Sequence, residues 1–203
     1  MPPRSILVEH WRELDGAVHP QDAPVFDRSS HSFNLDWPPP AYIGDVLNAR
    51  FILLMMNGGY DRQITPLEFP DAAAIERHID MLRNPRPIDP QSVSPYYGTG
   101  NYGQFIASGR LALVNACAYR SGKLSEEGMN RRLAENLPSV QLHRRWLREE
   151  LIPQALSGTK VIIAHRNRLW KLRQDEFRHA HIIFTRSGVS PNLPHWVLDS
   201  LEQ

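Results

Sequence analysis

The chain has 203 residues, which is enough for one domain with a buried core. Hydrophobic residues make up 41% and charged residues 22%, so the composition argues against disorder. The single cysteine, Cys117, excludes a disulfide framework, a four-thiolate zinc site and a thiolate-bound iron–sulfur cluster. We find no signal peptide, and the apolar runs are too short to span a bilayer, so we expect a cytoplasmic protein with no membrane partner.

The net charge of +1 conceals an uneven distribution. Residues 1–101 hold 8 Lys and Arg against 13 Asp and Glu, whereas residues 102–203 hold 15 against 9. A basic half of this kind can mark a phosphate-binding face. The alternative is that the basic residues coat solvated helices, which the sequence alone favours. The charge therefore supports a nucleic-acid partner without establishing one.

An N-terminal extension precedes the regular elements. Residues 6–14 form a short amphipathic stretch, and a polar, proline-rich segment then runs to Pro38-Pro39-Pro40. We expect residues 1–40 to pack on or near a single domain that covers residues 1–203. Four apolar runs bounded by turn residues follow, at residues 50–56, 111–116, 160–164 and 181–184. Continuous apolar runs are typical of strands buried on both faces, as in parallel sheets.

Helical patterns fill the gaps between these strands, at residues 71–83, 139–156, 167–172 and 194–201. Asp71 and Ser139 are placed to cap the first two helices, and Gly158 stands where a left-handed C-cap belongs. Strands that alternate with helices predict an α/β fold. We expect a three-layer sandwich around a central, mostly parallel four-stranded sheet.

The carboxyl ends of the strands are the first places to look for a ligand, because open parallel sheets bind ligands there. Asn57 and Asn115 lie at or just beyond two such ends. A buried Asn is costly unless it is hydrogen-bonded, and its amide can both donate to and accept from a base edge. Paired glycines after Asn57 let the backbone approach a ligand. The alternative for Asn57, equally weighted, is an ordinary Asn-Gly turn.

Several segments resemble the uracil-DNA glycosylase superfamily. Residues 51–60 resemble its motif one, where a hydrophobic strand in the mismatch-directed branches runs into Asn-Pro-Gly. Residues 40–44 resemble the lead-in of uncharacterised glycosylase-like members, and residues 113–116 are similar to the strand whose terminal Asn reads the base. Residues 184–190 stand where motif two, a loop that enters DNA, is expected. Comparable segments fall at residues 118–121, 137–139 and 166–170, so the resemblance spans roughly residues 38–195.

The resemblance implies a uracil-DNA glycosylase-like fold and a DNA-base glycosylase of base-excision repair. Such an enzyme hydrolyses the N-glycosidic bond of a flipped base and needs no cofactor or metal. The roles it implies are positioning of the attacking water by Asn57 (with Asp61 as an alternative acid/base), reading of the base by Asn115, stacking by Tyr60 or Phe69, and DNA contacts by His165, Arg166, Arg186 and Ser187. We expect a monomer with DNA as its partner.

Two departures from the family pattern keep other functions open. Gly58 replaces the usual proline, which predicts a less rigid turn. The His-Pro-Ser of motif two is missing, and no His follows Phe184 before His195. These departures favour an inactive glycosylase-fold module that binds nucleic acid or nucleotides. A third possibility is an enzyme that acts on a small nucleoside-like metabolite.

Two further candidates carry less weight. His179 and His181, two residues apart, suit a pair of metal ligands, but no third ligand has recognisable spacing. We therefore expect no metal site. Cys117 has no His or Asp near it in the sequence, so we expect a buried small residue rather than a nucleophile.

Overall fold

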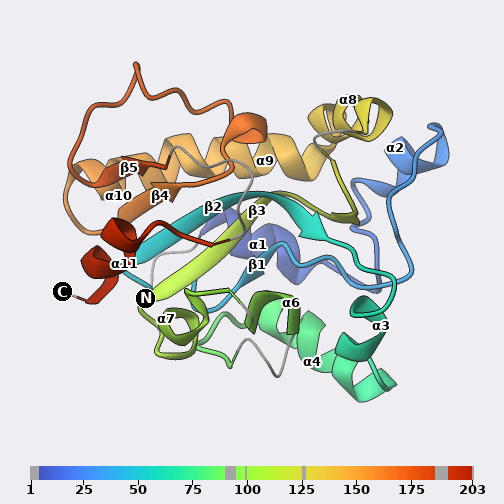
Figure 1. Ribbon diagram of the computed structural model, residues 1–203. Coiled ribbons are helices and arrows are strands. Elements are labelled where there is room, and N and C mark those ends of the chain that lie inside the picture. Colours follow the sequence, from blue (N-terminus) through green and yellow to red (C-terminus); the bar gives the residue numbers. More distant parts are fainter. Residues whose placement is uncertain (1–4, 90–94, 99, 125–126, 186–191, 203) are drawn as a thin grey trace.

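The computed structural model describes residues 5–89, 95–98, 100–124, 127–185 and 192–202. Within them, the centre of the fold is a five-stranded sheet in the order β1-β3-β2-β4-β5 (Figure 1). The strands are β1 (Tyr42–Ile43), β2 (Phe51–Gly59), β3 (Leu111–Ser121), β4 (Val161–Ala164) and β5 (Ile182–Phe184). Four of them run parallel, as the sequence predicts. The expected count of four was one too low, because β1 joins β3 as an antiparallel edge strand.

Helices cover both faces of this sheet, which confirms the three layers (Figure 1). One face, the α9 face, carries α1 (Ile6–Arg12), α9 (Pro138–Trp146) and α10 (Ile152–Leu156). The other, the α7 face, carries α6 (Pro95–Gly98), α7 (Gly103–Ala107) and α11 (His195–Glu202). The remaining helices are α2 (Ala23–Asp27), α3 (Thr65–Glu68), α4 (Ala72–Arg83), α8 (Gly128–Asn136) and a 3₁₀ turn (Arg168–Trp170).

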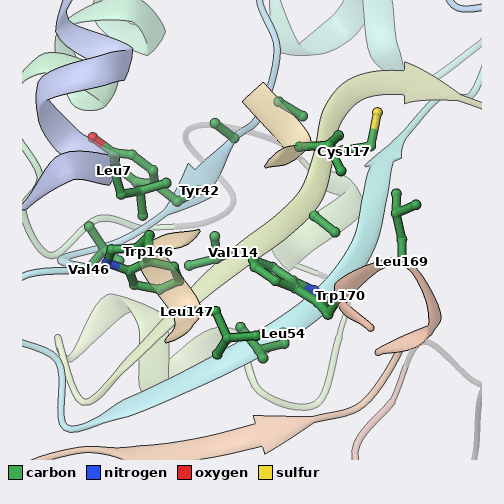
Figure 2. Packing of buried hydrophobic residues seen from close by; sticks show 14 of the residues in the cluster. Leu7, Tyr42, Val46, Leu54, Val114, Cys117, Trp146, Leu147, Leu169 and Trp170 are labelled. Carbon is green, nitrogen blue, oxygen red and sulfur yellow. The ribbon is translucent and has the colours of Figure 1, made fainter. Parts of the chain in front are cut away.

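Side chains of β2 and β3 alternate between two hydrophobic clusters, because successive residues of a strand point to opposite faces. Leu54 and Val114 enter the α9-face cluster, where Trp146, Leu147 and Trp170 gather over them (Figure 2). The neighbouring Leu53 and Leu113 enter the α7-face cluster instead. Both strands are therefore buried on both faces, as their continuous apolar sequence predicts. Cys117 is also buried, as expected, and burial raises the pKa of its thiol to about 12.

The structure confirms one predicted helix cap and corrects another. Asp71 caps α4, because its Oδ1 accepts a hydrogen bond from the backbone N–H of Ala74 at 2.8 Å. Ser139 does not cap the next helix: α9 begins at Pro138, and the Ser139 N–H donates to Asp22 Oδ1 at 3.0 Å. The prediction failed because Ser139 lies inside the first turn of α9, and Asp22, far away in the sequence, supplies an acceptor for an N–H group of that turn.

The predicted helix over residues 139–156 is not regular throughout. A π-helical turn, Leu147–Leu151, separates α9 from α10. It stands directly before the start of α10, where Pro153 has no N–H to donate to the preceding turn. Gly158, with φ +81°, is in the left-handed conformation expected of a C-cap. None of the helices described is long and apolar enough to cross a membrane.

Three buried histidines stay neutral in the fold. Burial lowers the pKa of His10 to about 3, that of His78 to about 3 and that of His143 to about 4. Neighbouring positive groups add to the effect at His10 and His78. The role of His143 is visible in its contacts, since its Nδ1 lies 2.8 Å from Asn115 O and its Nε2 accepts from Trp11 Nε1 at 2.7 Å.

We expect acid to destabilise the protein from about pH 6.5 downward. Below that pH the three histidines bind protons in the unfolded chain but not in the native one. Each therefore removes about 1.4 kcal/mol of unfolding free energy per pH unit until its native pKa is reached. Urea unfolding at pH 7, 6 and 5 measures the slope, and His10→Leu should reduce it by one proton. An unfolding free energy that is constant or rises from pH 7 to pH 5 would contradict this expectation.

Candidate functional site

The segment Asn57-Gly58-Gly59 is not the turn that the sequence suggests. β2 continues through Gly59 because β3 extends to Ser121 and pairs with it that far. The register shifts between Asn57, which pairs with Cys117, and Gly58, which pairs with Arg120. Such a bulge bends a strand and redirects its side chains, and bulges are common beside binding sites.

Gly58 is packed tightly, so the expectation of a less rigid turn was wrong. A Cβ atom at this position would lie 2.7 Å from Ala118 O and 2.8 Å from Cγ of Pro40. The ring of Pro40 therefore occupies the space that any side chain at position 58 needs. Gly58 is required here for a close approach of two backbone segments and not for a special φ angle.

Replacement of Gly58 by alanine should destabilise the protein by about 1–3 kcal/mol, because the added methyl overpacks a rigid backbone contact. Gly128→Ala is the matched control, since nothing lies within 4 Å of a Cβ there. Thermal or urea unfolding of both variants measures the difference. Equal stabilities of the two variants would contradict the tight packing of Gly58.

Asn57 is half-buried, and its amide orientation is fixed by the backbone. Its Nδ2 donates to Gly58 O at 2.7 Å and to Ser121 O at 3.2 Å. Both partners are carbonyls, so the nitrogen must face them and the oxygen must face away. Within the described chain, Asn57 Oδ1 accepts no hydrogen bond. It is therefore an acceptor that a water molecule or ligand can use.

Asn115 is fully buried and held in the same manner. Its Nδ2 donates to Pro40 O at 2.6 Å and lies 3.5 Å from the hydroxyl oxygen of Tyr97. Its Oδ1 is buried and finds no hydrogen-bond partner among the described residues. A buried acceptor without a partner costs about 1–3 kcal/mol. Such an unsatisfied group requires an explanation, and ligand binding is one.

Asn57 and Asn115 lie on neighbouring strands of the sheet. Asn57 lies two residues after Met55, and Asn115 lies two residues after Leu113; both of these apolar side chains belong to the α7-face cluster. Because the face repeats every two residues, Asn115 points to the α7 face, where its Nδ2 lies near Tyr97. Asn57 stands directly before the register shift, and its partner Cys117 belongs to the α9-face cluster. Asn115 pairs with Met55 and lies in the middle of β3, so the expectation that it stands at a strand end was wrong: β3 continues to Ser121 because it pairs with β2 as far as Gly59.

Two predicted residues have roles within the protein. The carboxylate of Asp61 is exposed, and its Oδ1 accepts from the backbone N–H groups of Gln63 and Ile64 at 2.8 and 2.9 Å. It thus forms the turn that leads to α3. The ring of Phe69 is buried and stacks on Trp37, with centroids 5.3 Å apart and planes at 9°. A base that stacks on this face of Phe69 would have to displace Trp37.

The other predicted residues lie along the same edge of the sheet. Tyr60 directly follows β2 and is half-buried. The backbone N–H groups of His165 and Arg166, which follow β4, both donate to Leu54 O. His165 Nδ1 lies 2.7 Å from Thr185 Oγ1. Arg186 and Ser187 lie outside the described residues.

The strand order makes this edge the place where a ligand is expected. The chain leaves β2 for β3 on one side and later enters β4 on the other. The strand order therefore reverses between β2 and β4, and ligands of open α/β sheets bind outside the carboxyl ends at such a switch point. Asn57 and His165 stand on its two sides.

A buried network that the sequence did not predict surrounds Pro38, Pro39 and Pro40, which we call the proline strap. Arg120 Nε donates to Pro38 O at 3.4 Å, and Nε2 of His78 lies 3.2 Å from Pro39 O. Pro40 O accepts from Asn115. Each carbonyl of the strap is thus bound by a buried side chain. The only signal in the sequence was the proline run, whose carbonyls need partners when they are buried.

Arg120 also carries a buried ion pair. Its Nη2 lies 2.7 Å from Oε2 of Glu68, and both side chains are 1% exposed. Its Nη1 donates to Gly59 O at 3.2 Å, and its guanidinium lies 5.3 Å from the centroid of the Phe69 ring. Arg120 therefore joins the proline strap, the end of β2 and α3.

Glu68→Leu should destabilise the protein by about 3–5 kcal/mol, because it leaves the Arg120 charge buried and uncompensated. The double variant Glu68→Leu/Arg120→Met should recover part of this loss. Asp80→Ala is the control: it breaks the exposed pair with Arg86 and should cost at most about 1 kcal/mol. A Glu68→Leu variant as stable as Asp80→Ala would contradict the assignment.

No family model, curated protein or solved structure matches this chain. Among the described residues, no group of three or more His, Cys, Asp or Glu side chains is arranged to hold a metal ion. The rings of His179 and His181 pack at 5.2 Å, and His181 Nδ1 lies 3.1 Å from Ala155 O. The candidate site thus rests on its own geometry, with Asn57 and Asn115 on the neighbouring strands β2 and β3.

Proposed function

We propose that the chain binds a nucleobase at Asn115 and is a DNA-base glycosylase-like protein. The observation that carries the proposal is the buried, unsatisfied Asn115 Oδ1, whose direction is fixed by the bond from Nδ2 to Pro40 O. An acceptor of this kind favours a ligand with an N–H donor. Ring N–H and exocyclic amino groups of nucleobases are such donors.

The rigid positioning of Asn115 supports the recognition of a specific ligand. Asn115 also donates its backbone N–H to Ala41 O and accepts from His143, so both its main chain and its side chain are fixed. A preformed polar group in an apolar wall discriminates strongly, because a ligand that lacks the donor leaves the acceptor unpaired. The surrounding α7-face cluster supplies the apolar wall.

The proposed reaction is hydrolysis of the N-glycosidic bond. Water oxygen bonds to the anomeric carbon, the bond from that carbon to the base nitrogen breaks, and its electron pair leaves with the base. The proton released by water is taken up by the departing base or by solvent. Asn57 Oδ1 would orient this water by accepting a hydrogen bond from it. Because an amide cannot take up the proton and the Asp61 carboxylate holds a turn, we expect a slow reaction.

The fold is compatible with the resemblance in the sequence. It has the three layers and the four parallel strands that the resemblance implies, and Asn57 and Asn115 stand on its two neighbouring central strands. The proposal includes DNA as partner, a role in base excision and a cytoplasmic location. The basic residues of the C-terminal half would meet the phosphates.

The second candidate function is an inactive module that recognises a base without cleavage. It is favoured by Asn57, whose amide is no base, and by Asp61, whose carboxylate holds the turn that leads to α3. In this case Asn115 would still bind the base, and the protein would act by holding an extruded nucleotide.

The test is an incubation with single- and double-stranded oligonucleotides that carry uracil, hypoxanthine, xanthine or a mismatched thymine. Alkali-labile abasic sites report cleavage. We expect Asn115→Ala to lower cleavage at least about 100-fold and Asn57→Ala about 10- to 100-fold, since the latter removes only an orienting contact. Asn136→Ala, at an exposed amide of α8, is the control.

The outcomes separate the two functions. Base-dependent binding without cleavage, weakened by Asn115→Ala, would favour the inactive module. Neither binding nor cleavage with any of these oligonucleotides would refute both functions. Cleavage that is unaffected by Asn115→Ala would refute the assigned site.

A further inference from the structure

A second site lies on the other side of the proline strap from Asn115. It is a cleft of about 240 Å³ between the end of α3, one side of α4 and the segment that follows α4. Its buried residues are Glu68, Ala74 and His78, and its exposed residues include Arg77 and Arg86. The volume is somewhat below the roughly 300 Å³ at which pockets for drug-sized ligands begin, so the cleft suits a small molecule.

His78 is a buried residue that lines this cleft, and one of its two ring nitrogens has no hydrogen-bond partner among the described residues. Its Nε2 lies 3.2 Å from Pro39 O and must carry the ring proton, because a carbonyl only accepts. The opposite ring nitrogen, Nδ1, is buried and has no hydrogen-bond partner in the described part of the chain. The two nitrogens point in different directions, so Nδ1 faces away from the strap.

Burial keeps this imidazole neutral. The side chain is 3% exposed, and burial, with a contribution from the charge of Arg120, lowers its pKa to about 3. At neutral pH, Nδ1 is therefore a lone-pair acceptor and not a cation. Its natural partner is an N–H or O–H group of a ligand.

The mouth of the cleft is cationic. Arg77 is exposed and makes no hydrogen bond or ion pair with the described residues. Arg86 is about half exposed and pairs with Asp80 at 2.7 Å, a kind of pair that water and anions exchange readily. The charge of Glu68 is already matched by Arg120. The mouth thus carries the guanidinium groups of Arg77 and Arg86. A planar guanidinium group can donate two hydrogen bonds to the oxygens of a phosphate.

Part of the wall of the cleft is apolar. Met81 and Ile88 line the cleft, and both are only partly buried against the α7-face cluster. A thioether and a branched aliphatic side chain provide the kind of surface on which a flat heterocycle packs. The cleft therefore combines a buried acceptor, an apolar wall and a cationic mouth.

We propose that this cleft binds a mononucleotide: an N–H of the base donates to His78 Nδ1, the base packs on Met81 and Ile88, and the phosphate binds Arg77 and Arg86. The same chemistry is present in a free nucleotide and in a terminal nucleotide of a DNA strand. The proposal does not depend on glycosylase activity, because none of these residues belongs to the Asn57 and Asn115 site.

Isothermal titration calorimetry with the four deoxynucleoside 5′-monophosphates and the corresponding nucleosides tests the site. We expect at least one monophosphate to bind in the micromolar to millimolar range. Arg77→Ala should weaken binding of the monophosphate about tenfold or more, so that the monophosphate no longer binds more tightly than the nucleoside. Ile88→Trp should block nucleotide and nucleoside alike by filling the cleft. Arg132→Ala, at an exposed arginine of α8, should change nothing.

A 5′-phosphorylated trideoxynucleotide distinguishes the two sources of the ligand. Binding of the monophosphate that responds to both cleft variants supports a free nucleotide. Binding of the trinucleotide alone, with the same response to the variants, supports a strand end. Failure of both probes to bind, or binding that neither Arg77→Ala nor Ile88→Trp weakens in folded protein, would overturn the proposal. The oligonucleotide cleavage assay measures activity at the Asn57 and Asn115 site. Failure of one proposal is therefore distinguishable from failure of the other.

Discussion

The carbonyl groups of the proline strap are the constraint on which the rest of the structure depends. Three successive prolines have no N–H groups, so the strap cannot pair as a regular strand, yet its carbonyls are buried and need donors. Arg120, His78 and Asn115 supply one donor each. Each of these side chains is thereby oriented, and its remaining polar atoms are directed away from the strap. Two of the three then face a candidate ligand site.

The proline strap also packs against the end of β2. The ring of Pro40 fills the space beside Gly58, and Arg120 ties Gly59 to Glu68. Removal of one side chain of this network would leave a buried charge or acceptor without a partner. Such a change costs far more folding stability than the loss of an exposed contact. We infer that the segment resembling glycosylase motif one is rigid here because of tertiary packing and not because of a proline within it.

The fold was largely predictable from the sequence because its determinants are local. Apolar runs marked the parallel strands, and Asp71 capped its helix as expected. The errors in strand length and helix capping came from partners far away in the sequence. Pairing with β3 continues β2 through Gly59, and Asp22 accepts a hydrogen bond from the N–H of Ser139. The rule for strand ends selected Asn57 and Asn115. The network of Arg120, Glu68 and His78 was missed, because no local pattern reveals which buried polar groups meet.

The central claim is that Asn115 presents a fixed, unoccupied acceptor to a base. The most direct measurement is the side-chain amide signal of Asn115 in a ¹H–¹⁵N spectrum, assigned by its loss in Asn115→Ala, during titration with free uracil or hypoxanthine. Our account predicts a saturable shift of this signal, while the exposed amide of Asn136 stays in place. An Asn115 signal that does not move at any concentration of either base would contradict it.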